Sequence, residues 1–159
     1  MNARLIFAVV SMLLISAAGA EVPKTAAEAA AAVERQGASS FLSGLSPEEV
    51  DQLYEHFDNG EAEWLPLVPK LASVADGANA EGLTISMAFA LPKNPRGVLS
   101  LITEKDGVLG VGRVCSMPFI EDTAPEGYRS KALAALGKVA DLTLRQVKSL
   151  CLHALKRSR

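Results

Sequence analysis

Residues 80–102 read AEGLTISMAFALPKNPRGVLSLI, and this stretch decides how the rest of the chain can fold. In its first part, apolar residues follow the i, i+4, i+7, i+8 spacing of a helix that faces a core: Leu83, Met87, Ala90 and Leu91. At the corner, Asn94 can accept a hydrogen bond from a free amide, and Pro95 suits a first helical position, which needs no N–H. The stretch therefore predicts a helix, a rigid corner and a short second helix with Val98, Leu99 and Ile102.

Two strand interpretations compete with this one. Residues 84–91 also alternate strictly between larger apolar and smaller side chains, which is a strand pattern. Further on, residues 105–107 (Lys-Asp-Gly) could turn a hairpin between 98–103 and 108–114, which would make the fold α+β. The alanine content and the proline corner favour a helix for the first segment. For 108–114, which contains Gly110 and Gly112, a helix is favoured and a strand stays open.

The remaining segments carry helix signals of their own. Capping boxes begin at Thr25, Ser46 and Thr143, and the second is followed by apolar residues at helical spacing that end at an Asp-Asn-Gly stop. Residues 61–75 predict a helix with an irregular start, because Pro66 and Pro69 each remove an amide donor. The last helix is expected to bury Leu144, Val147, Leu150, Cys151, Ala154 and Leu155. The fold class is therefore all-α: six to eight short helices in stacked antiparallel pairs, similar in style to HEAT repeats but without a fixed period.

The N-terminus has the layout of a secretory signal peptide. Arg4 precedes an apolar run over residues 5–15, and Ala18-Gly19-Ala20 matches a small-x-small cleavage pattern. The run is shorter than the roughly 20 residues that a membrane span needs. We expect cleavage after Ala20, which leaves residues 21–159 as one helical domain in the periplasm with no membrane span.

The chain has two cysteines, Cys115 and Cys151, and in an oxidising compartment an even count favours one disulfide. A metal pair or a catalytic thiol are the competing interpretations. A metal site needs more ligands than two distant cysteines, and a nucleophile needs a nearby base. His153 lies about 200° around a helix from Cys151, so these two residues do not predict a shared ligand site.

The net charge of −2 conceals a division along the chain. Residues 21–126 carry 17 acidic and 7 basic residues, whereas residues 127–159 carry one acid, Asp141, and eight bases. Seven acids without an intervening base form what we call the acidic ridge: Glu48, Glu49, Asp51, Glu55, Asp58, Glu61 and Glu63. The ridge is either a solvated helix face or a surface that docks on a basic partner.

A second candidate is the loop at residues 118–122, Pro-Phe-Ile-Glu-Asp. Its two apolar residues and two acids could plug a groove on a partner, or they could pack back on the core. The predicted partner-binding residues are Glu48, Glu49, Asp51, Glu55, Asp58, Phe119 and Asp122.

The sequence contains none of the motifs HExxH, GxSxG or SxxK, and no glycine-rich phosphate loop. His56 has no nucleophile beside it in sequence, so we predict neither an enzyme nor a cofactor or metal site. The basic residues lack interleaved aromatics, which argues against nucleic acid as a partner.

The segments ALPKNPRGVL, VCSMPFIED and CLHAL resemble those of small exported all-helical proteins of Gram-negative bacteria. In size, compartment and acidic surface the chain is also similar to periplasmic immunity proteins that inhibit secreted cell-wall-degrading toxins. Export, the acidic ridge and the absence of a catalytic constellation predict an exported, non-enzymatic domain that binds another protein, as a periplasmic inhibitor or immunity-type protein. The alternative is a periplasmic small-ligand-binding or chaperone-like module that holds an apolar ligand between its helices.

Overall fold

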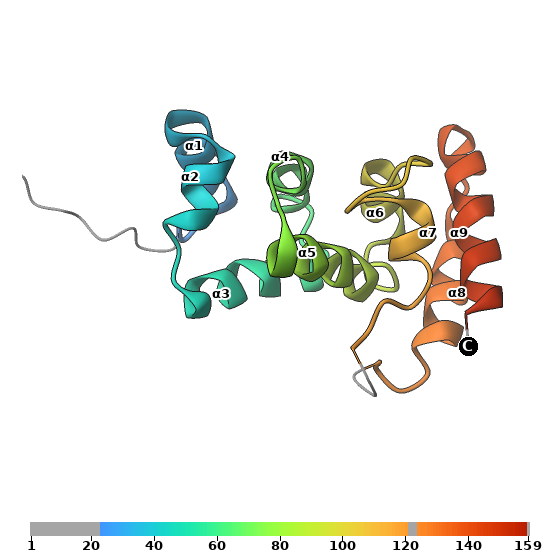
Figure 1. Cartoon of the computed structure of the whole chain (residues 1–159). Coiled ribbons are helices and arrows are strands. Elements are labelled where there is room, and N and C mark those ends of the chain that lie inside the picture. The colour runs from blue at the N-terminus through green and yellow to red at the C-terminus, as the bar shows by residue number, and fades with distance from the viewer. Residues whose placement is uncertain (1–22, 121–123, 159) are drawn as a thin grey trace, which may run out of the picture.

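The computed structural model describes residues 23–120 and 124–158 (Figure 1). Within them the chain forms nine α-helices and two 3₁₀ turns, at Leu65–Leu67 and Leu142–Leu144. The helices are α1 (Ala26–Gln36), α2 (Ala38–Ser43), α3 (Pro47–Asp58), α4 (Val68–Ala72), α5 (Gly77–Ala90), α6 (Pro95–Leu101), α7 (Val111–Val114), α8 (Tyr128–Lys138) and α9 (Arg145–Arg157). The all-α prediction is confirmed.

The hairpin alternative for residues 98–114 is wrong. Residues 98–101 belong to α6. In the segment that follows, the only β-type pairing is an isolated bridge between Thr103 and Gly110. Thr103 N donates to Leu109 O at 2.8 Å, and Val111 N donates to Thr103 O at 2.7 Å. The chain therefore closes a small loop and turns into α7 instead of pairing two strands.

The corner between α5 and α6 forms as the sequence predicts. Asn94 Oδ1 accepts a hydrogen bond from Gly97 N at 2.9 Å, and Pro95 is the first residue of α6. Asn94 Nδ2 also donates to Gly60 O at 2.8 Å, just beyond the end of α3. Gly60 has φ +67°, and a Cβ there would lie 2.9 Å from Asn94 Cβ, so only glycine allows this close approach. One asparagine thus joins the start of α6 to the end of α3.

The core is built on the contact between α3 and α5, the most extensive between any two helices described. Leu53 and Phe57 of α3 and Leu83 and Met87 of α5 are fully buried. The helices approach closely at Gly82, where a Cβ would collide with the ring of Tyr54. Trp64, the only tryptophan of the chain, is 2% exposed and belongs to this core.

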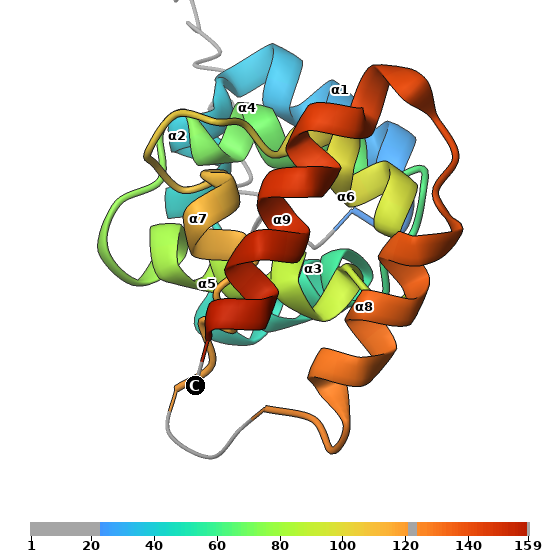
Figure 2. The same ribbon diagram turned by 90° about the vertical axis from the view of Figure 1, so that its right-hand side faces the viewer.

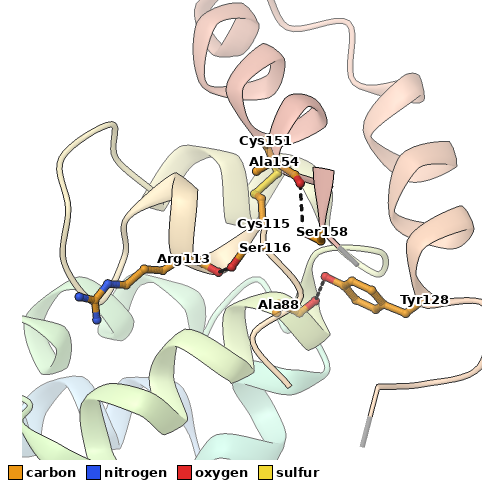
Figure 3. The surroundings of a disulfide bond; sticks show 8 residues. All are labelled: Ala88, Arg113, Cys115, Ser116, Tyr128, Cys151, Ala154 and Ser158. Atoms are coloured by element: carbon orange, nitrogen blue, oxygen red, sulfur yellow. Dashed lines mark hydrogen bonds between the residues drawn. A yellow bond between two sulfur atoms is a disulfide. The ribbon is translucent and has the colours of Figure 1, made fainter. Parts of the chain in front are cut away.

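A disulfide joins α9 to the middle of the chain. Cys115 and Cys151 are bonded, with their Cα atoms 5.2 Å apart, and neither is exposed (Figure 3). Cys115 directly follows α7, so the bond fixes α9 against it, and the two helices lie side by side in Figure 2. The predicted disulfide is confirmed.

The start of α9 differs from the prediction. Thr143 does not open a capping box, because residues 142–144 form a 3₁₀ turn in which Asp141 Oδ1 accepts from Thr143 N at 3.0 Å. The Asp141 side chain therefore accepts from the Thr143 amide, which in the predicted capping box would have donated to the Gln146 side chain. The burial prediction is wrong for Leu150, which is 39% exposed, whereas Cys151 and Leu155 are buried.

Between residues 23 and 158, leaving out 121–123, no helix has the length and apolar character to cross a bilayer. The predicted signal peptide lies outside the described residues. The disulfide is consistent with an oxidising compartment.

Candidate functional site

The outer face of α3 carries three exposed carboxylates, which we call the acidic stripe: Glu48, Asp51 and Glu55. They stand at i, i+3 and i+7, so they follow one another along one side of the helix. The apolar side of α3, with Leu53 and Phe57, is buried against α5. No ion pair or side-chain hydrogen bond joins the stripe to another part of the chain that the structure describes.

Other acids of the ridge serve the fold. Glu49 Oε2 accepts from Ser46 N at 2.7 Å, which completes the predicted capping box at the start of α3. Asp58, the last residue of α3, is half-buried, and burial raises the pKa of its carboxyl above the ordinary value, although the Ser86 hydroxyl and the Lys93 charge oppose the shift. Its Oδ1 is buried and has no hydrogen-bond partner among the described residues. These two carboxylates are therefore placed differently from the stripe.

Glu61 belongs to a small cluster at the end of α3. Its Oε2 lies 2.7 Å from His56 Nδ1, and the His56 ring stacks on buried Trp64 with centroids 4.0 Å apart and an interplanar angle of 4°. This arrangement gives His56 a packing role and a carboxylate partner. Glu63 is exposed, like the residues of the stripe.

The two predicted residues of the 118–122 loop have different outcomes. Phe119 packs inward, with its ring centroid 4.9 Å from Phe89 and 4.7 Å from Tyr128. Tyr128 in turn donates its hydroxyl to Ala88 O at 2.9 Å (Figure 3). Phe119 thus contributes to an aromatic cluster over the end of α5. Asp122 lies outside the described residues.

The disulfide engages both cysteines, so neither is a thiol or a metal ligand in this state. In the described ranges no three His, Cys, Asp or Glu side chains gather closely enough to hold a metal ion. His153 is exposed, and its Nε2 lies 3.4 Å from Arg157 Nη1. The site residues that the structure offers are therefore surface charges.

Two concave places among the described residues are open surface grooves. One, of about 560 Å³, lies between the corner at residues 92–96 and the end of α8. Another, of about 550 Å³, lies between α5 and the segment from Arg113 to Pro118. Both have polar and apolar walls, in contrast to the deep apolar pocket that the small-ligand alternative expects.

Sequence reasoning missed the first groove. Lys93 and Arg96 stand in the stretch that opened the argument, but Lys138 comes from α8, far along the chain. Their common location depends on how α8 packs on α6, which no local pattern specifies. The signal available was the cluster of two cations around the prolines at 92 and 95.

Charge is divided between the two halves of the molecule. Residues 23–90 carry eleven acidic and three basic residues, and residues 91–158 carry six acidic and eleven basic ones. Figure 1 shows that the first half, from α1 to α5, lies toward one end and the second half, up to α9, toward the other. The acidic stripe and the basic groove thus belong to opposite halves.

No protein-family model, curated protein or solved structure matches this chain. The likeness to exported helical and immunity-type proteins, drawn from short motifs and general character, therefore stays a prediction.

Proposed function

We propose that the chain is an exported, non-enzymatic domain of the inhibitor or immunity type, which binds a basic partner protein through the acidic stripe of α3. The observation that carries the proposal is the stripe itself: three exposed carboxylates, aligned on one helix face, without a basic partner in the parts of the chain that the structure describes.

This arrangement has a cost in stability. Asp51 and Glu55 stand at i and i+4, where like charges destabilise a helix by roughly 0.2–0.5 kcal/mol. Glu48 at the first turn is favoured by the helix dipole, but Glu55 near the C-terminal end is not. If this face only needed to be solvated, a lysine at one of these positions would make the helix more stable. Retaining three acids is better explained by a partner that supplies the positive charge.

A fixed array of charge also suits the kinetics of an inhibitor. Complementary potentials raise association rates and select against partners of the wrong sign. The stripe lies on a helix whose opposite face is locked into the core, so little ordering is needed on binding. Export and an oxidised disulfide would place the domain where secreted cell-wall hydrolases act.

The test compares the mature protein, residues 21–159, with the triple variant Glu48→Lys, Asp51→Lys, Glu55→Lys. Each is immobilised in oxidised form and exposed at low salt to a panel of purified basic cell-wall hydrolases, with binding and inhibition measured. We expect one hydrolase to bind the parent protein one-to-one, with an affinity that falls as salt rises. The triple variant should not bind this hydrolase.

The matched control is Glu81→Lys, Glu104→Lys, Glu126→Lys, which changes the net charge equally at three exposed acids off the stripe. It should retain most of the affinity. If both triple variants lose affinity alike, net charge and not the stripe governs binding. If the stripe variant binds as tightly as the parent, the stripe is not the interface.

A further inference from the structure

The groove between the α5–α6 corner and the end of α8 combines an apolar floor with charged side chains. Five of its residues contribute hydrocarbon surface: Pro92, Pro95, Ala135, Val139 and Ala140. Its volume of about 560 Å³ falls within the range of roughly 300–1,000 Å³ that is usual for small-molecule sites. Two prolines on one wall restrict the backbone, so this wall is formed before any ligand arrives.

The charges around this lining are mostly positive. Lys93, Arg96 and Lys138 line the groove with a single acid, Asp141, which gives a formal net charge of +2. The cations come from both walls, two from the corner and one from the last residue of α8. A ligand in the groove would therefore meet positive charge on two sides.

The acid in the groove is already engaged. Asp141 Oδ1 accepts from Thr143 Oγ1 at 2.6 Å and from Thr143 N at 3.0 Å, and its Oδ2 lies 3.0 Å from Arg96 Nη2. These bonds, those from Thr143 above all, hold the pKa of Asp141 below its usual range. Asp141 thus stays ionised and steadies one end of the Arg96 guanidinium.

The cations keep capacity for a ligand. A guanidinium has five N–H donors, and the hydrogen bond from Arg96 to Asp141 uses one of them. Lys93 Nζ donates to Asn59 Oδ1 at 2.9 Å and has two donors left. Lys138 is exposed and makes no side-chain hydrogen bond or ion pair with the described residues. Charge-assisted bonds from such groups are stronger than neutral ones.

We propose that this groove binds a small amphiphilic organic anion, with its acidic group between Arg96 and Lys138 and its apolar body over the prolines and Val139. This site is separate from the acidic stripe of α3 and does not rest on the proposed function. Its charge is opposite to that of the stripe, so the same ligand would be repelled there.

The test uses two probes with the same apolar body. The anion is 8-anilinonaphthalene-1-sulfonate, and its neutral counterpart is N-phenyl-1-naphthylamine; both report binding by fluorescence. We expect saturable one-to-one binding of the sulfonate, with at least about tenfold weaker binding of the neutral probe. Amide shifts in a ¹⁵N spectrum should cluster at residues 92–96 and 135–141.

Lys138→Gln and Arg96→Gln should each weaken sulfonate binding about fivefold or more. The matched control is Lys156→Gln, at an exposed lysine of α9 outside the groove, and it should leave the affinity for the sulfonate unchanged. Thermal unfolding of each variant verifies the fold, and Lys138→Gln is the decisive one because no described side chain depends on Lys138. The proposal would be overturned if the sulfonate binds without saturation, if both probes bind equally tightly, or if all three variants lose the same sulfonate affinity.

Discussion

At the scale of single residues, Asp58 is the side chain whose environment conflicts most with its charge. It ends α3, where the helix dipole disfavours a negative group, and its Oδ1 is buried without a partner among the described residues. Burial raises the pKa of the carboxyl, and Glu55 adds to the shift. Its ionised form therefore lowers the stability of the native state.

Asp58→Asn should raise the thermal midpoint at pH 7, by about 1–3 °C, since solvent reaches part of the side chain and screens the effect. The native pKa is above the unfolded one, so the native state binds the proton more tightly. The wild type therefore loses stability as pH rises from the ordinary value of 3.8 through the native pKa. The advantage of the variant should be full at pH 7 and absent at about pH 3, which thermal unfolding across pH would measure.

Glu63→Gln provides the control, because Glu63 belongs to the same ridge and its side chain is exposed. Its midpoint should follow that of the wild type at every pH. A lower midpoint for Asp58→Asn at pH 7 would mean that the carboxylate is held by interactions stronger than its burial cost.

At the scale of elements, the corner at residues 91–95 depends on two hydrogen bonds from one side chain. Asn94→Ala removes the bond to Gly97 N and the bond to Gly60 O, and should lower the free energy of unfolding by about 2 kcal/mol. Asn94→Ser keeps an acceptor for the cap, but the serine side chain is too short to bond Gly60 O. Its free energy of unfolding should therefore fall by about half as much. Urea unfolding of the three proteins would measure both values.

Equal losses in the two variants would assign the whole effect to the bond with Gly60. In that case the cap of α6 would contribute little. No loss in either variant would mean that Pro95 and the packing of Val98 and Leu99 alone fix the corner.

The same elements show what the sequence could and could not predict. The caps at Thr25, Ser46 and Asn94 form as predicted, because a cap joins residues only three positions apart. The prediction at Thr143 was wrong because Asp141, two residues earlier, competes for the same amide. Periodicity identified the buried side of α3 but could not predict that Asp58 faces Ser86 of α5. Such pairings depend on tertiary packing, as does the approach of Lys138 to the α5–α6 corner.

At the scale of the whole molecule, the fold separates the charges that the sequence already divides. Counting residues predicts an acidic and a basic half, but not that successive helices extend them toward opposite ends. Each surface then has its own electrostatic field, since charges farther apart than about 8–10 Å are largely screened in physiological salt. The stripe and the groove can therefore serve different partners at once.

The disulfide connects the basic end to the rest of the fold, and its removal is the broadest test of the architecture. A loop closed over 36 positions constrains the unfolded chain, and on the chain-entropy account the bond contributes about 4 kcal/mol. Cys115→Ala with Cys151→Ala should lower the thermal midpoint by about 10 °C, measured by circular dichroism. Measuring the wild-type protein with reductant separates the contribution of the bond from that of side-chain packing, because the reduced protein keeps the two buried sulfur atoms and loses only the bond. A reduced midpoint close to the oxidised one would mean that packing of Leu155 and its neighbours, without the bond, holds α9 in place.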